Sequence, residues 1–320
     1  LCQCSRVPAM PSVDNRIDRR DWGLLGLLSV LWGGSFFFNG MILRELPPLT
    51  LVLLRVVLGT IILLPLLRAR KIEFPRGVPG WAPFVAMGLF NNVLPFSLIV
   101  FGQTYIPSGL ASILNATTPL FAVVIMAAAG EERLQARRVV GVVVGLIGVA
   151  ILHGDALGFE SRQGIGIALC LAGAFSYGIA ALVGRRLPQR VPPLGTATFQ
   201  MLASAVMIAP IAAVADRPWL LPMPQATTWL AVLGLAALST ALAYIVFFQI
   251  LQRSGATNVV LVTLLIPATA MLLGYLVLGE PVSWREVTGA LVIASALLLI
   301  DGRVLTFGQR KQRPVGSTTR

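Results

Sequence analysis

The sequence predicts an all-α integral membrane protein with ten transmembrane helices, arranged as two inverted five-helix repeats with both termini in the cytoplasm. Two observations predict this fold class. The chain is 56% hydrophobic and only 12% charged, with a mean hydropathy of +0.83, which is typical of a protein whose solvent is lipid. Ten apolar stretches fill the chain, and the second five repeat the pattern of the first five at an offset of about 145 residues.

Most of the ten apolar stretches are long enough to cross a membrane as a helix. A helix needs about 20 residues to cross the roughly 30 Å hydrocarbon core of a bilayer. The expected spans are residues 22–43, 48–67, 80–104, 108–129, 138–152, 164–183, 193–214, 227–251, 256–278 and 286–300. The fifth and tenth are short, so we expect their ends to extend into the flanking loops.

Polar and helix-breaking residues mark the spans, and these marks recur from one half of the chain to the other. In the first half they are Pro47-Pro48-Leu49, Gln103, Ser108-Gly109, Pro119, Glu132, Arg137 and Gly141. In the second half they are Pro192-Pro193-Leu194, Gln249, Ser254-Gly255, Pro267, Glu280, Arg285 and Gly289. An odd number of spans per repeat places the second copy upside down in the membrane. Inverted repeats are characteristic of transporters, whose substrate site lies at the repeat interface near the bilayer midplane.

The expected domain plan follows from these repeats. It consists of a cytoplasmic N-terminal tail (1–21), a first repeat (22–152), an outer linker (153–163), a second repeat (164–300) and a cytoplasmic C-terminal tail (301–320). The chain starts at Leu1, and Met10 is a candidate for the native start. We expect no cleavable signal peptide, because the first apolar stretch is too long for one.

The formal net charge of +12 is concentrated on one side of the predicted membrane. With the N-terminus in the cytoplasm, twenty Lys and Arg residues fall on the inner side and four on the outer side. This bias follows the positive-inside rule and supports two cytoplasmic termini. The basic charge therefore indicates no nucleic-acid partner, and the expected partners are the lipid bilayer and a small-molecule substrate.

The chain offers no residues for catalysis or for holding a cofactor or metal. Its single histidine, His153, lies at the end of the fifth span, and no serine-nucleophile, zinc-protease or phosphate-loop motif is present. Cys2, Cys4 and Cys170 form no disulfide framework. We therefore expect no enzyme and no cofactor.

Polar side chains recur near one depth in repeat-related spans. Because uncovered polar groups are costly in hydrocarbon, this set favours a polar central cavity. The candidate substrate-binding residues are Trp32, Phe36, Asn91, Asn92, Asn115, Thr118, Ser176, Tyr177, Ser239, Thr240, Tyr244 and Thr263. Pro119 and Pro267, each of which removes a backbone donor from a helix, are the candidate hinges.

These residues also have structural interpretations. A single Asn, Ser or Thr in a membrane helix more often joins helices, contributing about 1–2 kcal/mol, than binds a ligand. Trp32, Phe36 and Tyr177 fit a substrate platform and bundle packing equally well. Arg55, inside the second span and matched in the repeat by Gln200, could hold a substrate carboxylate, but we favour a structural role such as capping helix carbonyls.

The acidic residues bear on energy coupling. All thirteen Asp and Glu residues fall at termini, loops or span edges. Proton-driven exporters of cations typically need a titratable carboxylate in the cavity, so its absence disfavours that class. With Arg55 as the one internal base, the cavity also suits phosphorylated substrates poorly. We expect a neutral or zwitterionic substrate and facilitated transport.

Three motifs carry a resemblance to a known family. They are Leu31-Trp32-Gly33-Gly34-Ser35-Phe36, Pro48-Leu49 followed by Arg55, and Gly130-Glu131-Glu132 with its second-half copy Gly279-Glu280-Pro281. Over residues 22–300 the chain resembles the EamA-type, ten-helix branch of the drug/metabolite transporter superfamily. The resemblance implies alternating access around a cavity lined mainly by spans 1, 3, 4, 6, 8 and 9. The second copy departs from the pattern, with Phe175-Ser176 in place of Trp32-Gly33.

Substrates within this superfamily range widely. The neutral, aromatic-edged cavity expected here suggests an amino-acid exporter that resembles the YddG-like exporters of aromatic and neutral amino acids. The sequence therefore favours a bacterial inner-membrane exporter of small neutral or zwitterionic metabolites, above all amino acids including aromatic ones, working as a monomer or homodimer. Alternatives are a proton-coupled exporter of drugs, nucleosides or other metabolites and, in another class, a membrane scaffold without transport.

Overall fold

The computed structural model describes residues 19–132, 135–153, 161–187 and 191–301, and all regular structure in these ranges is helical. Most of the two predicted tails (residues 1–18 and 302–320), the middle of the outer linker, and Cys2, Cys4 and Met10 lie outside them. The first half contains α1 (Arg19–Ile42), α2 (Pro48–Ala69), α3 (Gly77–Gly88), η1 (Leu89–Val93), α4 (Leu94–Gly102), α5 (Ser108–Asn115), α6 (Thr118–Ala128) and α7 (Ala136–His153). The second half contains α8 (Arg162–Arg185), α9 (Pro193–Ala215), η2 (Pro218–Leu220), α10 (Ala226–Ala236), η3 (Ala237–Leu242), α11 (Ala243–Leu273), η4 (Gly274–Leu278) and α12 (Trp284–Asp301).

Many of these helices are long and apolar enough to cross a membrane. Among the described residues, seven helical stretches meet this condition: Arg20–Ile42, Pro48–Ala69, Gly77–Gly102, Ser108–Ala128, Arg162–Arg185, Pro193–Ala215 and Ala226–Phe247. Val262–Leu278 is apolar but shorter. The two remaining helices, α7 and α12, have 18 residues each. The all-helical membrane class is therefore confirmed, whereas the count of ten spans stays a prediction.

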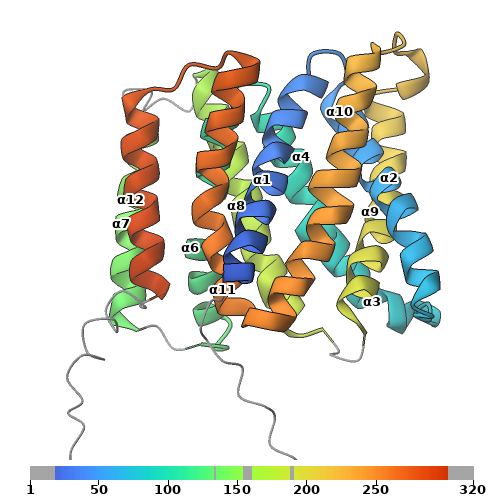
Figure 1. Ribbon diagram of the computed structural model, residues 1–320, viewed down its shortest axis with the longest axis horizontal. Coiled ribbons are helices and arrows are strands. Elements are labelled where there is room, and N and C mark those ends of the chain that lie inside the picture. The colour runs from blue at the N-terminus through green and yellow to red at the C-terminus, as the bar shows by residue number, and fades with distance from the viewer. Residues whose placement is uncertain (1–18, 133–134, 154–160, 188–190, 302–320) are drawn as a thin grey trace, which may run out of the picture.

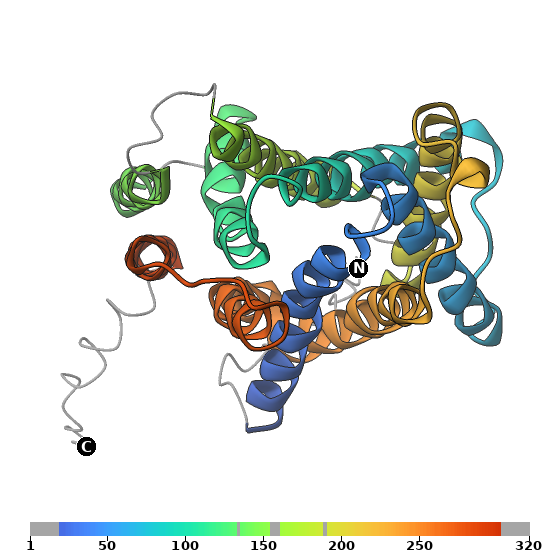
Figure 2. The same cartoon turned by 90° about the horizontal axis from the view of Figure 1, so that it is seen from above.

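The helices form one bundle with a separate pair at its edge. In the bundle, α1 packs on α11, α2 on α9, and both α4 and α6 on α8. At the edge, α7 packs mainly on α12, and Figures 1 and 2 both show this pair side by side, away from α2 and α9. The orange ribbon in Figure 1 reverses direction within α11, so the two arms of α11 run in opposite directions.

Glycines allow the closest helix crossings. A Cβ atom on Gly33 of α1 would lie 2.0 Å from Thr269 Oγ1 of α11, so the Trp32-Gly33-Gly34 motif is where α11 approaches α1. Thr269 Oγ1 also lies 2.9 Å from the Ser29 carbonyl, to which it can donate a hydrogen bond. Small residues at such crossings let backbones pack tightly where lipid supplies no hydrophobic driving force between helices.

The α7–α12 pair uses the same device. A Cβ atom on Gly141 would lie 2.5 Å from Ile300 Cγ1, and one on Gly148 would lie 2.7 Å from Ile293 Cγ1. Gly145 instead faces Leu120 of α6. These glycines therefore pack within the chain, while the lipid-facing side of α7 presents exposed apolar side chains, namely Val139, Val140, Val143, Leu146 and Ile147.

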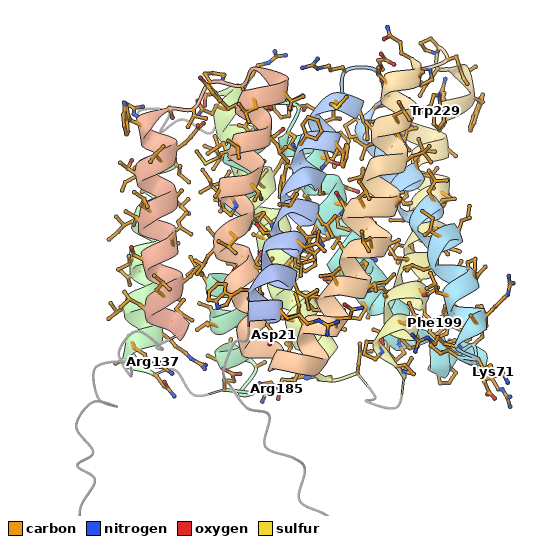
Figure 3. All side chains as sticks on the ribbon, viewed as in Figure 1. Asp21, Lys71, Arg137, Arg185, Phe199 and Trp229 are labelled. Atoms are coloured by element: carbon orange, nitrogen blue, oxygen red, sulfur yellow. The ribbon has the colours of Figure 1, made fainter. Side chains whose placement is uncertain are left out.

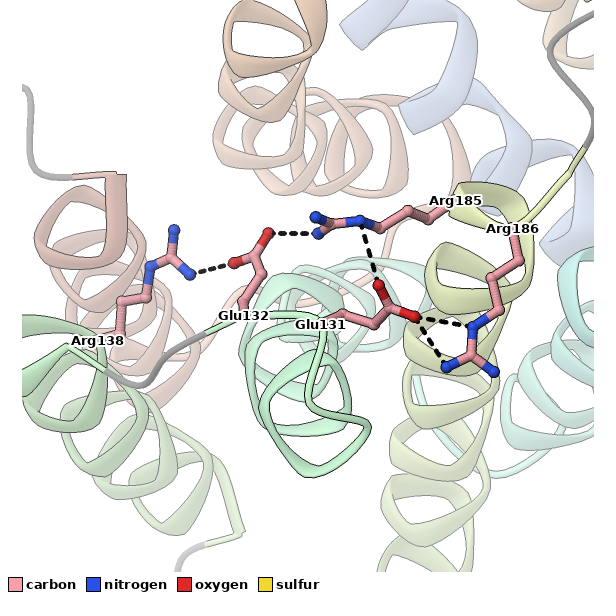
Figure 4. A network of polar contacts seen from close by, with 5 residues as sticks. All are labelled: Glu131, Glu132, Arg138, Arg185 and Arg186. Carbon is pink, nitrogen blue, oxygen red and sulfur yellow. Dashed lines mark hydrogen bonds and ion pairs between the residues drawn. The ribbon is translucent and has the colours of Figure 1, made fainter.

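One end of the bundle carries a cluster of charged residues (Figure 4), and Figure 3 shows Lys71, Arg137 and Arg185 at this same end, here called the basic end. Gly130 adopts a left-handed φ of +73°, which ends α6 and is tolerated best by glycine. Glu132, which follows, pairs with Arg138 of α7 and, at 2.9 Å, with Arg185 of α8. Glu131 pairs with Arg186 at 2.8 Å. The hydrogen bond from Arg138 is the main reason that the pKa of Glu132 lies below its usual range.

The opposite end is held by carboxylates that accept hydrogen bonds at helix N-termini. Asp216, after α9, accepts bonds from the backbone N–H (2.7 Å) and hydroxyl (3.0 Å) of Thr50 in the first turn of α2. Glu280 accepts from the N–H of Ser108, the first residue of α5, at 3.0 Å. Glu45 accepts from the N–H of Gln225, just before α10, at 2.8 Å. Each contact joins the two halves of the chain and complements the positive end of a helix dipole.

Candidate functional site

Two π-helical turns lie at equivalent places in the two halves. The turn η1 separates α3 from α4, and η3 separates α10 from α11. Their first residues, Leu89 and Ala237, are as far apart in sequence as Pro119 and Pro267. Single π-turns inside α-helices occur frequently at functional sites, because they displace side chains and backbone carbonyls from the regular ladder.

Side chains from two other helices bond to η1, and one of them satisfies a carbonyl that the turn displaces. Pro95 has no N–H, so it cannot bond to the Phe90 carbonyl five residues earlier. The Ser176 hydroxyl of α8 donates to that carbonyl at 2.9 Å. The Ser204 hydroxyl of α9 donates to the Gln200 carbonyl of its own helix at 2.6 Å and accepts from Asn92 of η1 at 3.0 Å. The first π-turn is therefore fixed to two helices of the second half.

A network of amides and hydroxyls surrounds η1. Asn92, with no exposed surface, donates through Nδ2 to Ser204 Oγ at 3.0 Å and accepts at Oδ1 from the Tyr244 hydroxyl at 3.4 Å. Asn91 Nδ2 donates to Gln200 Oε1 at 3.2 Å. Gln200 Nε2 in turn lies 3.5 Å from the Tyr244 oxygen. These residues come from η1, α9 and α11, so the network joins both halves of the chain.

Arg55 of α2 lies beside this network. It is 7% exposed, and its Nε–H donates to Thr240 Oγ1 at 3.2 Å. The Thr240 hydroxyl in turn donates to the Leu235 carbonyl at 2.9 Å. Leu235 lies five residues earlier, before the π-turn η3. The guanidinium carbon lies 3.8 Å from the centre of the Phe96 ring, a cation–π contact. Tyr177 and Tyr244 are close enough to interact with Arg55 electrostatically.

We call this set of residues the central polar cluster: Arg55, Asn91, Asn92, Phe96, Ser176, Tyr177, Gln200, Ser204, Thr240 and Tyr244. Six of the twelve candidate substrate-binding residues belong to it, namely Asn91, Asn92, Ser176, Tyr177, Thr240 and Tyr244. Tyr177 packs against both of the large hydrophobic clusters, so it lies between them. Among the described residues, the ion pairs of the chain all lie outside this cluster.

The other aromatic candidates pack into the apolar core. Phe36 is 6% exposed, and Trp32 contacts Phe247 with ring centres 5.5 Å apart. Ser239 adjoins Thr240 in sequence, but its hydroxyl lies toward Gly34 of α1 and has no hydrogen-bond partner among the described residues.

Asn115 and Thr118 mark a break between α5 and α6. The Thr118 hydroxyl donates to the Asn115 carbonyl at 2.8 Å, and Asn115 Oδ1 is enclosed without a hydrogen-bond partner in the described part of the chain. Pro119 is the second residue of α6, so the break immediately precedes it, as expected for a residue that disfavours helix before itself. Pro267 differs, because it lies inside α11 without interrupting it. The two predicted hinges therefore do not share one geometry.

Thr263 and Pro267 line an apolar groove instead of the central polar cluster. This groove, of about 510 Å³, lies between α5, α11, η4 and α12. Leu272, Tyr275 and Leu291 on its walls are each more than half exposed, so the groove opens on the outside of the bundle. Its apolar lining suits contact with lipid chains better than binding of a polar metabolite.

Three members of the central polar cluster were not predicted from the sequence: Phe96, Gln200 and Ser204. A fourth, Arg55, was assigned a structural role. Gln200 and Ser204 are four residues apart on α9 and so share a face, and Gln200 is the repeat equivalent of Arg55. That spacing was the available signal, but nothing in the sequence showed that this face contacts Asn91 and Asn92.

Comparison with known proteins settles the family. The model of the EamA-like transporter family matches residues 21–153 and 164–301. The chain belongs to the EamA-like transporter family. The match covers most of the chain and agrees with the resemblance carried by the glycine motifs. It identifies a membrane transporter.

Several curated relatives of this EamA-like protein carry transporter names. It is 25% identical over 295 residues to an uncharacterized transporter, YoaV, of Bacillus subtilis (strain 168), covering 90% of this chain and 98% of that protein. It is 27% identical over 290 residues to a probable amino-acid metabolite efflux pump of Salmonella typhimurium, covering 88% and 95%. It is also 27% identical over 281 residues to an uncharacterized inner membrane transporter, YedA, of Escherichia coli (strain K12), covering 87% and 90%.

A solved crystal structure shares the fold of this EamA-like chain. The two superpose with a TM-score of 0.63 over 92% of this chain and all of the other, at 22% sequence identity. At that identity the likeness shows the fold alone.

Proposed function

We propose that this chain exports small neutral or zwitterionic metabolites, above all amino acids including aromatic ones, across the bacterial inner membrane. The observation that carries the proposal is the central polar cluster, a set of buried and partly buried amides, hydroxyls and aromatic rings contributed by both halves of the chain. Its partners Asn91, Asn92 and Gln200 both donate and accept hydrogen bonds, which suits a substrate that carries both kinds of group. Relatives named as probable amino-acid metabolite efflux pumps support the substrate class.

The proposal includes ten spans in two inverted repeats, residues 22–152 and 164–300, with both termini in the cytoplasm. Packing supports this plan. In the repeat, α4 corresponds to the first part of α11 and α8 corresponds to α1, and the structure shows both equivalent contacts, α4 with α8 and α11 with α1. The recurrence of a π-turn at η1 and η3 supports it too. The labelled Lys71, Arg137 and Arg185 lie at one end of the bundle in Figure 3, as expected for a cytoplasmic face.

Alternating access requires that each end of the bundle open in turn while the other stays closed. Both ends carry contacts that join the halves: Glu132 with Arg185 at the basic end, and Asp216 with Thr50 at the opposite end. The central polar cluster belongs to the helices between these ends. In this mechanism a rocking motion of the halves breaks one set of contacts at a time, so substrate reaches the cluster from one side only.

Facilitated transport is the coupling mode that the cluster favours. Among the described residues, the central polar cluster contains no Asp or Glu that could carry a proton across the membrane. Export would then follow the substrate gradient established by metabolism.

The test is uptake into proteoliposomes of radiolabelled amino acids, nucleosides and cationic drugs, with and without an imposed pH gradient. We expect saturable amino-acid uptake that the gradient leaves unchanged. Stimulation by the gradient would overturn the facilitated mechanism, and saturable uptake of drugs or nucleosides without amino-acid uptake would overturn the substrate class.

A further inference from the structure

Arg55 is a buried cation without a counterion among the described residues. It lies seven residues into α2, or about 10 Å along the helix from its first residue. Within the described residues, Arg76, Arg138, Arg185 and Arg186 form ion pairs with glutamates, and Arg55 takes part in none of these pairs. Burying an unpaired charge is costly, and proteins usually pair such a charge or bind an ion to it.

The protein uses little of the hydrogen-bonding capacity of Arg55. A guanidinium has five N–H groups, of which the Nε–H bonds to Thr240. The two terminal nitrogens make no hydrogen bond to the described residues, yet they are not among the fully enclosed polar atoms that lack a partner. These two nitrogens therefore retain accessible surface. The ring of Phe96 covers the face of the guanidinium and leaves its N–H edge available.

The surroundings of Arg55 select the kind of ligand. Tyr177, Tyr244 and Gln200 supply neutral hydroxyl and amide groups, and the described part of the cluster holds no carboxylate. Such a site carries one net positive charge, which disfavours a cationic ligand and favours an anionic group. The planar fork of arginine matches the two oxygens of a carboxylate.

We propose that Arg55 binds the carboxylate of the transported substrate, with the two terminal nitrogens paired to its two oxygens. This inference rests on the proposed transport of amino acids and names the group of the substrate that is recognised. Gln200, the repeat equivalent of Arg55 on the helix that packs against α2, is neutral, so the two halves present one cationic side and one neutral side. The carboxylate is therefore held by the first half, and the rest of the substrate lies toward the amides and Tyr177.

The experiment uses three compounds that share one ring. Phenylalanine has a carboxylate and an ammonium group, 3-phenylpropionate has only the carboxylate, and phenylalaninamide has only the ammonium group. Uptake into proteoliposomes and the melting temperature of the purified protein in detergent are measured for the wild type, Arg55→Gln and Arg55→Lys. Arg68→Gln is the matched control, because Arg68 lies on the same helix but is exposed.

We expect the wild type to take up phenylalanine at least about tenfold faster than its amide, and 3-phenylpropionate to compete with phenylalanine. Arg55→Gln should lose this preference, and Arg68→Gln should match the wild type. Arg55→Lys should keep only part of the preference, because lysine keeps the positive charge but lacks the two parallel N–H donors of the guanidinium. Equal uptake of phenylalanine and its amide by the wild type, or an unchanged preference in Arg55→Gln, would overturn the inference. Should Arg55→Gln fail to melt cooperatively, the comparison of the wild type with Arg55→Lys decides, and an undiminished preference in Arg55→Lys contradicts the paired geometry.

The melting temperature separates this inference from the proposed function. If the wild type takes up no amino acid, the proposed function fails. The carboxylate site still stands if 3-phenylpropionate stabilises the wild type but not Arg55→Gln, and it falls if neither acid stabilises the wild type more than the amide does.

Discussion

At the scale of single residues, the interior of this chain distinguishes polar groups that join helices from polar groups that remain available. Asn92 is fully buried and uses both ends of its amide, one toward Ser204 and one toward Tyr244. Thr198, on the same helix as Ser204, is just as buried, but its hydroxyl bonds only to the Leu194 carbonyl of its own helix. Burial alone therefore does not identify a residue of the central polar cluster; Asn92 belongs to it because its side chain bonds to Ser204 and Tyr244 on other helices.

Replacing Asn92 by leucine should impair transport while leaving the protein folded. The change removes two hydrogen bonds between helices, each contributing about 0.5–1.5 kcal/mol, and we expect amino-acid uptake to fall by about tenfold. Uptake into proteoliposomes measures the effect. Thr198→Val, which removes an equally buried hydroxyl outside the cluster, should retain uptake. Wild-type rates in Asn92→Leu would place the substrate elsewhere.

At the scale of helices, the glycine motifs of the sequence predict close helix crossings, but they do not predict which helix each glycine contacts. Gly33 is followed by a second glycine, and the motif itself does not tell which one faces another helix. The structure places Gly33 against Thr269, whereas the nearest atom to a Cβ on Gly34 would be 3.7 Å away, an ordinary contact. A Cβ atom on Gly26 would meet nothing within 4 Å. The sequence alone does not distinguish such an uncrowded glycine from Gly33.

Gly33→Ala and Gly26→Ala should therefore have opposite effects on stability. Alanine favours helix over glycine by about 1 kcal/mol, so Gly26→Ala should leave the melting temperature in detergent unchanged or raise it. Gly33→Ala must separate α1 from α11 and should lower the stability by about 1–3 kcal/mol. A Gly33→Ala protein as stable as Gly26→Ala would show that the α1–α11 crossing relaxes at no cost.

The π-turns belong to this scale too. The sequence predicted long spans over 80–104 and 227–251 with polar residues near their midpoints, and helices cover both regions. It did not predict that Leu89–Val93 and Ala237–Leu242 would adopt π-geometry. For η1, that outcome depends on two serines of other helices: Ser176, whose hydroxyl donates to the Phe90 carbonyl, and Ser204, which accepts a hydrogen bond from Asn92.

At the scale of the whole molecule, the two ends of the bundle are held by different chemistry. The basic end uses ion pairs between Glu131 or Glu132 and arginines that lie in α7 or at the C-terminal end of α8, at partly exposed positions. The opposite end uses single carboxylates at helix N-termini, as at Asp216 and Glu280. Exposed ion pairs are screened by salt, so the contacts at the basic end should weaken more than those at the opposite end when the salt concentration rises.

The pH dependence of stability should measure the contribution of the Glu132 carboxylate at the basic end. The pKa of Glu132 is lowered in the folded protein, so the stabilisation from its ionised form is fully present above its ordinary pKa of about 4.3 and is lost as the pH falls through the lower folded value. Melting temperatures of wild type and Glu132→Gln should therefore differ by a constant amount above about pH 5 and converge in more acidic buffer.

The matched control for this comparison is Glu73→Gln. Glu73 also pairs with an arginine, Arg76, but both side chains are more than four-fifths exposed. We expect this variant to follow the wild type at every pH. A difference between wild type and Glu132→Gln that persists unchanged into acid would mean that the carboxylate contributes through its shape and not through its charge.

The sequence by itself determined the membrane class, the family motifs, the approximate limits of the helices and more than half of the residues of the proposed site. These follow from local properties, namely the length of apolar stretches, the positions of Gly and Pro, and the cost of a polar group in hydrocarbon. Tertiary structure decided which polar residues meet. It brought Gln200 and Ser204 to Asn91 and Asn92, placed Thr263 on an outer groove, and left Arg55 beside a phenylalanine ring instead of a carboxylate. The physical reason is that hydrogen-bond partners from helices more than a hundred residues apart are selected by packing of the whole bundle, which no local pattern records.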